Sequence, residues 1–274
     1  MVWFCGVRRV GKSAIVASLD NSLAHLVDCE NLPNSVTPDT ADFLYRASPK
    51  PILILDEAQA LSGLPAILAR CFESRPKLGI VVVSSTGPPP PELLNAVQPV
   101  KTVAIHCVPF LWNELINDVR TQSEARLYYG GFPVPLIRED TYSPATYDDW
   151  MAVFFACDFS GHSKTEDFQL FRKVFRGVLR RSGEPLNLTT LAAEAGSSRK
   201  TVSNIVHCLE DLCAVSLLNP HHQEPKRPGR EVTSTPLLYA CDTGLVCRII
   251  GWNENDGDLK NRLWRHVVLE YLQA

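Results

Sequence analysis

A glycine loop close to the N-terminus constrains the fold more than any other feature of the sequence. Residues 6–14 read GVRRVGKSA, which fits the pattern G-x-x-x-x-G-K-[S/T]. Such a loop holds phosphate on converging backbone N–H groups, so it needs glycines, a strand before it and a helix after it. The apolar residues 1–5 predict the strand, and residues 12–26 predict the helix. A chance match, expected in roughly one chain in a hundred of this length, is the alternative.

The loop residues have separate expected roles. Lys12 would place its charge on the β- and γ-phosphates of ATP, and Ser13 would ligate Mg²⁺. The whole loop would surround the phosphates, through Gly6, Val7, Arg8, Arg9, Val10, Gly11, Lys12, Ser13 and Ala14.

A second apolar segment supplies the acidic half of such a site. Residues 52–59 read ILILDEAQ, and a run that is apolar on both faces predicts a central strand of a parallel sheet. Asp56 would hold Mg²⁺ through its water shell, and Glu57 would activate the attacking water as a general base. A strand that merely ends in a solvated acidic loop is the alternative.

Further strands complete a predicted α/β sheet, at residues 26–28, 51–55, 79–83 and 103–105. We expect strand 79–83 to lie between the first strand and the acidic strand. Ser84, Ser85 or Thr86 would then act as a sensor that hydrogen-bonds the γ-phosphate or the attacking water. An ordinary Ser/Thr turn before Gly87 is the alternative for each of them.

The two nucleotide motifs and three later stretches resemble one family. GVRRVGKS with ILILDEAQ is similar to the AAA+-type P-loop ATPases of bacteria and archaea that read G-x-R-R-V-G-K-[S/T] and L-D-E-[A/I/V]-Q. VPFLWNEL (108–115), YYGGFPVPL (128–136) and LLYACDTGL (237–245) resemble its P-L-S-F-x-E, G-G-F-P and Y-x-x-D-x-G-L stretches, in the same order. The resemblance implies an ATPase domain, a winged-helix domain and a C-terminal domain that resembles restriction nucleases.

The sequence departs from that family pattern in three places. It lacks the usual segment before the first strand, and it ends at Ala274, where the nuclease-like domain would be developing. The family's T-G-S after the third strand reads Ser84-Ser85-Thr86, and its G-R has become Gln98-Pro99 or nearby. The expected domains are a P-loop ATPase domain over 1–125, a helical linker or lid over 126–182, a winged helix over 183–245, and a C-terminal helical segment, the start of a truncated domain, over 246–274.

Residues 188–215 have the spacing of a helix-turn-helix around Gly196. Arg199, Lys200 and Asn204 would be exposed at the start of its second helix, where duplex DNA is contacted. Between residues 164 and 200, eight Lys and Arg stand against four Asp and Glu. A winged helix that serves only for packing, or for moving with the ATPase state, is the alternative.

Composition sets few limits. The net charge of −3 gives the 274 residues no global attraction to nucleic acid or acidic membranes. No apolar run reaches the length of about 18 residues that a bilayer needs, so we expect no membrane span and a cytoplasmic location. The nine cysteines contain no C-x-x-C and are expected to be reduced. A metal cluster is the sharper alternative, without a common zinc spacing, from Cys208, Cys213, His221 and His222.

Together these patterns predict an α/β, AAA+-like P-loop NTPase sheet followed by a mostly helical winged-helix domain. The protein would bind ATP and Mg²⁺, hydrolyse ATP and contact DNA or a protein partner, as a monomer or a homo-oligomer. The alternative is a non-enzymatic, nucleotide-gated DNA-binding regulator in which the P-loop domain is a switch or a scaffold.

Overall fold

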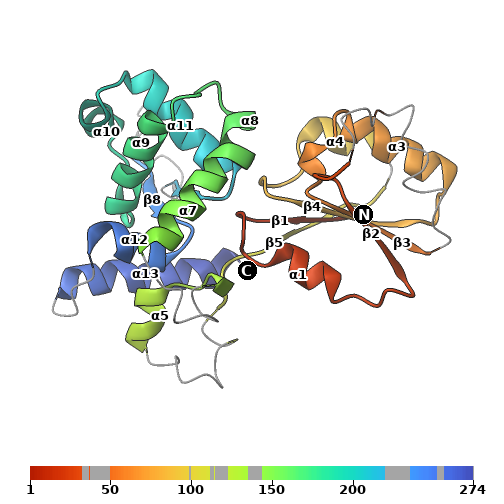
Figure 1. The fold of residues 1–274 in the computed structure, drawn as a ribbon, viewed down its shortest axis with the longest axis horizontal. Helices are drawn as coiled ribbons and strands as arrows, with labels where there is room; N and C mark the ends of the chain where they lie inside the picture. Colours follow the sequence, from red (N-terminus) through yellow and green to blue (C-terminus); the bar gives the residue numbers. More distant parts are fainter. Residues whose placement is uncertain are drawn as a thin grey trace, which may run out of the picture. The chain divides into compact units, whose positions relative to one another are not determined.

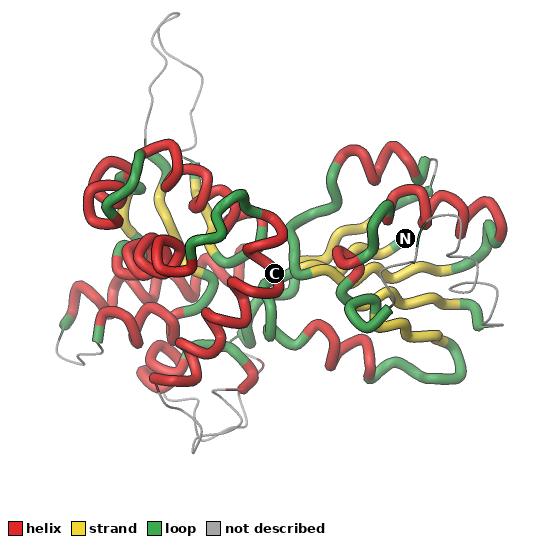
Figure 2. The backbone as a smooth tube through the Cα atoms, turned by 45° about the horizontal axis from the view of Figure 1, so that its top comes forward, coloured by secondary structure: helices red, strands yellow, loops and turns green. Residues whose placement is uncertain are grey.

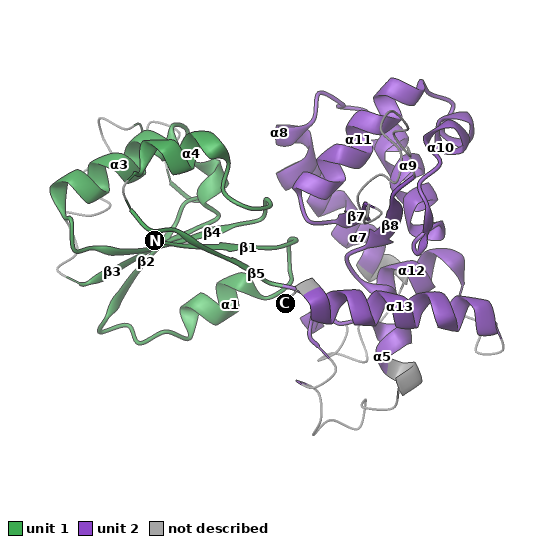
Figure 3. Ribbon diagram, turned by 180° about the vertical axis from the view of Figure 1, so that it is seen from behind, with its two compact units in different colours: residues 1–107, 274 green, residues 108–273 purple. Residues whose placement is uncertain are grey.

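The computed structural model describes most of the chain, which divides into two compact units (Figure 3). Unit 1 comprises residues 1–107 and unit 2 comprises residues 108–273. The described residues are 1–32, 37, 50–98, 100–111, 114, 123–134, 144–219, 235–251 and 256–273.

Unit 1 is built on a five-stranded sheet in the order β2-β3-β4-β1-β5, with all neighbours parallel (Figure 1). Strand β4 therefore lies between β1 and the acidic strand β3, as predicted for residues 79–83. The strands are β1 (Val2–Cys5), β2 (Ala24–Asp28), β3 (Ile52–Asp56), β4 (Gly79–Ser84) and β5 (Val103–His106).

Helices cover both faces of this sheet (Figure 1). Helices α3 (Leu64–Ser74) and α4 (Pro91–Ala96) lie on one face, over a core that includes Trp3 and Leu55. Helix α1 (Lys12–Ala17) lies on the other face, where Val16 packs with Phe4, Ala24, Ile54 and Val83. Because β1, β3 and β4 are buried on both sides, their sequences read as continuous apolar runs. The α/β P-loop NTPase fold expected from the sequence is confirmed.

One helix is shorter than predicted. Helix α1 ends at Ala17 instead of continuing to about residue 26, and β2 begins at Ala24. The Ser18 hydroxyl donates to the Ile15 carbonyl, and the Asp20 carboxylate accepts from the Ser22 N–H. These local side-chain bonds favour a turn over further helix, so the apolar residues after Ala17 do not extend it.

Unit 2 is mostly helical and carries a small antiparallel sheet in the order β6-β8-β7 (Figure 2). Its strands are β6 (Glu184–Pro185), β7 (Val215–Leu218) and β8 (Leu237–Ala240). Its described helices are α5 (Ser123–Tyr129), α7 (Pro144–Phe154), a π-helical segment (Phe155–Phe159), α8 (Ser160–His162), α9 (Phe168–Arg180), α10 (Leu188–Ala195), α11 (Arg199–Asp211), α12 (Thr243–Ile250) and α13 (Gly257–Gln273).

The pair α10–α11 matches the predicted pair of helices around Gly196. Gly196 ends α10 with φ +68°, a left-handed conformation that suits glycine. Asn187 caps α10 and Ser198 caps α11 through side-chain bonds to backbone N–H groups. The second helix ends at Asp211, and the following residues form β7.

Candidate functional site

The glycine loop connects the carboxyl end of β1 to α1. Gly6 has φ +151°, and a Cβ there would collide with the Cys107 carbonyl oxygen. Gly11 has φ +107° and precedes the first residue of α1. Both positions therefore need glycine, one for close backbone approach and one for its conformation.

Lys12 is 4% exposed and reaches back over this loop. Its Nζ donates to the Gly6 carbonyl at 2.8 Å and to the Val7 carbonyl at 3.1 Å. It also donates to Ser85 Oγ, at 3.3 Å, at the end of β4. The ammonium group thus lies where the loop and the strand ends meet.

Asp56 ends β3 and lies beside Ser13 of α1. Burial raises the pKa of Asp56, while the hydrogen bond with the Ser13 side chain and the nearby Lys12 charge act in the opposite direction. A carboxylate and a hydroxyl are oxygen ligands of the kind that Mg²⁺ prefers. Gly6 and Gly11 carry no Cβ and leave the loop open at these two positions. Together with this loop, the carboxylate and the hydroxyl fit a magnesium triphosphate.

Glu57 follows Asp56 and is held by three neighbours. Its backbone is left-handed, with φ +50°. Its Oε2 accepts from Ser85 Oγ at 3.1 Å and from Gln59 Nε2 at 2.5 Å. The Arg8 guanidinium lies 3.7 Å from the same oxygen. The carboxylate predicted to be the base is therefore fixed beside the loop.

The three polar residues after β4 differ in their contacts. The Ser85 hydroxyl joins Lys12 to Glu57, and is the predicted sensor that the structure brings to both groups. Ser84 and Thr86 instead hydrogen-bond each other, at 2.8 Å between their hydroxyl oxygens. Ser84 also donates to the Gln59 side-chain oxygen.

The predicted DNA-contact residues lie together at the start of α11. Arg199, Lys200 and Asn204 are all exposed. Arg199 also lines a hollow of about 670 Å³, together with His207 and Asn187 at the start of α10. The arrangement leaves the first two turns of α11 accessible.

A buried polar centre joins the later sequence motifs in unit 2. Arg126 is 1% exposed, and its Nη2 lies 2.6 Å from Glu270 Oε2 of α13. The same guanidinium donates to the Phe110 carbonyl and to Thr243 Oγ1. Asp242 is fully buried and accepts from the Gly131 N–H at 2.6 Å. The stretches around residues 110, 131 and 242 thus form one interior junction.

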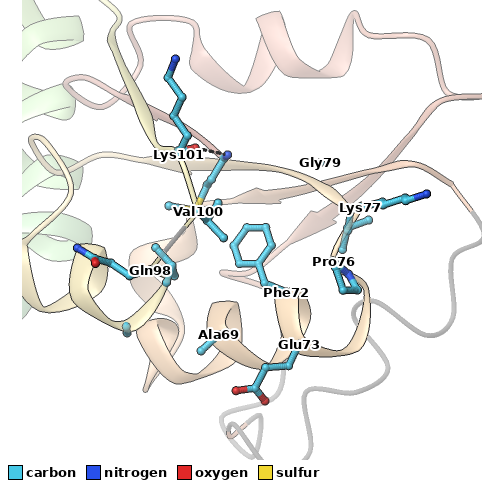
Figure 4. A pocket seen from close by; sticks show the side chains of 13 residues that line it. Ala69, Phe72, Glu73, Pro76, Lys77, Gly79, Gln98, Val100 and Lys101 are labelled. Atoms are coloured by element: carbon cyan, nitrogen blue, oxygen red, sulfur yellow. Dashed lines mark hydrogen bonds between the residues drawn. The ribbon is translucent and has the colours of Figure 1, made fainter.

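Another hollow, of about 640 Å³, lies at the opposite ends of the strands from the glycine loop. The starts of β1, β4 and β5 contribute Met1, Gly79 and Lys101 to it. Phe72 of α3 points into its centre, and Lys77 and Lys101 extend away from it (Figure 4). Its position separates it from Lys12, Asp56 and Glu57.

The cysteine–histidine metal cluster has no support within the described part of the chain. No group of three or more metal-ligating side chains occurs among those residues. Burial raises the pKa of Cys208 to about 12, which favours the neutral thiol. His221 and His222 lie outside the described residues.

Comparisons with known families divide the chain at nearly the same place as the fold. Residues 1–115 match the model of the AAA domain family. Residues 120–256, half of the chain, match the model of a domain of unknown function (DUF8612). The chain belongs to the DUF8612 family. The AAA domain match, with the fold of unit 1, supports a P-loop ATPase domain of the AAA+ type.

Solved structures with some similarity include the Thermotoga maritima RuvB Holliday junction branch migration motor. The identity is 17% and the TM-score 0.40, over 80% of this chain and 82% of that chain. A structure of Drosophila ORC bound to DNA is 10% identical with a TM-score of 0.26, over 93% of this chain and 90% of that chain. No curated protein matches the chain. Among the described helices, none has the length and apolarity to cross a bilayer.

Two residues of the AAA domain site were not assigned specific roles from the sequence. Gln59 donates to Glu57 and accepts from Ser84 and Ser85. The sequence predicts Arg8 only as a loop residue, and in the structure it also faces Glu57 and Glu30. The Q of the L-D-E-A-Q motif was a usable signal for Gln59. No sequence signal pairs Arg8 with acids some 20 and 50 positions away.

Proposed function

We propose that the AAA domain binds ATP with Mg²⁺ and hydrolyses it. The observation that carries the proposal is the chain of contacts from Lys12 through Ser85 to Glu57 at the mouth of the glycine loop. It joins a group suited to hold phosphate to a carboxylate suited to accept a proton. Lys12 and the loop N–H groups would hold the phosphates, and Ser13 and Asp56 would hold Mg²⁺.

Bound Mg²⁺ would neutralise charge on the phosphate oxygens. Glu57 would take a proton from a water molecule as the oxygen of that water bonds to the γ-phosphorus. The bond from the γ-phosphorus to the bridging oxygen would break, and the products would be ADP and inorganic phosphate. Ser85 would keep the Glu57 carboxylate oriented toward that water.

Two variants test this assignment. We expect Lys12→Ala to abolish ATP binding in calorimetry, since it removes the one cation buried in the loop. We expect Glu57→Gln to retain ATP binding and to lose about 10²–10⁴-fold in phosphate release, the usual contribution of a general base. Turnover that Glu57→Gln leaves unchanged would refute the assigned base.

We further propose that residues 183–245 form a winged-helix domain within unit 2, beside an ATPase domain over 1–125, a helical linker over 126–182 and a C-terminal helical segment over 246–274. Helices α10 and α11 with the sheet β6-β8-β7 support it. Its exposed Arg199, Lys200 and Asn204 would contact duplex DNA. A loss of duplex affinity on Arg199→Ala/Lys200→Ala tests that contact.

A second candidate function shares this DNA contact but has no hydrolysis. Glu57 is held by Ser85, Gln59 and Arg8, which would also suit a site that binds nucleotide as a switch. Calorimetry with ATP and Mg²⁺, followed by phosphate release with and without DNA, separates the two functions. ATP binding without release in either condition favours the switch.

A further inference from the structure

The outward face of α9 carries four cations and no acidic residue. The helix buries the following side chains: Phe171, Val174, Phe175, Val178 and Leu179. An arc about 100° wide on the opposite side, at 100° per residue, contains these residues: Gln169, Arg172, Lys173, Arg176 and Arg180. From Arg172 to Arg180 the stripe is about 12 Å long, at 1.5 Å per residue.

These four cations differ from other arginines of unit 2 in their partners. Arg126 pairs with Glu270, Arg181 with Glu194, and Arg262 with Glu184. Within the described part of the chain, no carboxylate lies within 4.0 Å of the cationic groups of the α9 stripe. The charge of this face is therefore not balanced locally.

Two of the four side chains are partly immobilised. Arg172 and Arg176 are half-buried, and Arg176 Nε is shielded from solvent without a hydrogen-bond partner among the described residues. Packing of such stems along a helix holds the charged ends near fixed positions. Lys173 and Arg180 are exposed. The face thus presents a row of positive charge.

The chemistry of this face favours phosphate over an acidic protein. Protein interfaces usually have an apolar or aromatic core. No large hydrophobic residue is exposed on α9, α10 or α11, so these three helices offer no such core. Three of the four cations are arginines, whose planar guanidinium matches phosphate oxygens.

We propose that the α9 stripe binds the phosphodiester backbone of duplex DNA, outside the 188–215 segment. Along the axis of a duplex, the stripe length corresponds to about three or four phosphates of one strand, at a rise of about 3.4 Å per phosphate. The inference rests on the proposed binding of duplex DNA by unit 2, and adds to it a surface that reads no base sequence.

The salt dependence of duplex binding tests the stripe. In fluorescence anisotropy with a labelled duplex and the full chain, the change R172Q/K173Q/R176Q/R180Q should weaken binding. The slope of log affinity against log salt should fall in magnitude by about 3.6, which is about 0.9 for each of four lost phosphate contacts. Triple replacement R172K/R176K/R180K should keep most of the slope, since it keeps the charge.

A matched variant controls for net charge. K77Q/K101Q/K164Q/R265Q removes the same number of cations from positions outside α9, and should change the slope by much less. Circular dichroism should show both quadruple variants to be folded, because Gln is a good helix former. An equal loss of slope in the two quadruple variants overturns the proposal.

The α11 variant separates this inference from the proposed function. If R199Q/K200Q lowers duplex affinity and the α9 variant does not, the stripe is refuted and the α11 contact stands. If only the α9 variant lowers it, the stripe stands and the α11 contact fails. Absence of duplex binding at low salt overturns both, while ATP hydrolysis is judged separately by phosphate release. Equal competition by polyglutamate and by unlabelled duplex also overturns the choice of phosphate.

Discussion

Arg8 connects the glycine loop to two acidic residues, Glu30 and Glu57. Its guanidinium lies 3.3 Å from Glu30 Oε1 and 3.7 Å from Glu57 Oε2. The side chains of Arg8 and Glu57 are 13% and 14% exposed, so solvent screens this pair only in part. Glu30 is half-exposed and is the weaker anchor. Arg8 is thus a positioning residue for Glu57.

We expect Arg8→Ala to lower kcat for ATP about tenfold, equivalent to about 1.4 kcal/mol, with little change in the ATP dissociation constant. The physical reason is that Glu57 loses one of three groups that orient its carboxylate. Steady-state phosphate release and calorimetry measure the two quantities. Arg8→Lys should recover part of the rate, because it restores a cation without the planar group.

Glu30→Gln is the matched control for this prediction. It removes the other partner of Arg8 and leaves Glu57 in place, so its effect on kcat should be smaller. A loss of ATP affinity with unchanged kcat in Arg8→Ala would instead assign Arg8 to phosphate binding.

For single residues, the sequence predicts which side chains lie near the site better than it predicts the direction in which each side chain points. Lys12, Asp56 and Ser85 could be expected to meet, because carboxyl ends of parallel strands share one edge of the sheet. The choice of Ser85 over Ser84 and Thr86 could not be predicted. The choice depends on which hydroxyl faces Lys12 after the end of β4. The alternation of side chains along a strand does not continue into a turn, so it does not determine this.

Helix α13 is the element held by the buried polar centre of unit 2. Its Glu270 faces Arg126, and its His266 lies 3.4 Å from Ser182 Oγ. Burial raises the pKa of Glu270 to about 8, with Asp242 adding to the rise and Arg126 opposing it. Burial lowers the pKa of His266 to about 4. Asp242 and Glu270 are therefore both close to Arg126. Glu270 keeps its proton in the folded state at neutral pH.

These shifts predict a pH-dependent stability for unit 2. Between pH 6.5 and 8, folded Glu270 keeps a proton that the unfolded chain has already lost, so the free energy of unfolding should fall as the pH rises. The limit is about 1.4 kcal/mol per pH unit, or about 2 kcal/mol over this window. Urea unfolding at several pH values, followed by tryptophan fluorescence, measures it.

Glu270→Gln should flatten this dependence, since an amide does not titrate. His266 supplies the opposite sign at lower pH. The free energy of unfolding of unit 2 should fall as the pH decreases from 6.5 toward 4. In this range the histidine of the unfolded chain binds a proton and the buried histidine of the folded chain does not. An unchanged slope above pH 6.5 in Glu270→Gln would show that another group carries the proton.

The elements themselves were partly predictable. The apolar residues of 167–181 recur at helical spacing, and this segment forms α9 (Phe168–Arg180). Helix α1 stopped early because a few polar side chains favoured a turn, which apolar spacing does not register. The junction of Arg126, Asp242 and Glu270 joins segments more than 100 residues apart. Local patterns carry no information on such pairings.

On the scale of the whole molecule, each unit has its own core. The apolar clusters on both sides of the unit 1 sheet are formed by residues before 107. In unit 2, Trp150, Phe154, Phe171 and Phe175 stack around α9. Two cores of this kind predict two unfolding transitions rather than one.

ATP should then stabilise only one of those transitions. At a hundred times the dissociation constant, a ligand that binds the folded state alone adds about 2.7 kcal/mol to its stability. For a unit of about 100 residues, that raises Tm by about 10–20 °C. We expect this shift in the unit 1 transition with ATP and Mg²⁺ and none in Lys12→Ala. The proposed ATP contacts all belong to the glycine loop and the strand ends of unit 1. A unit 2 transition whose Tm rises by the same amount would therefore show that the two cores unfold together.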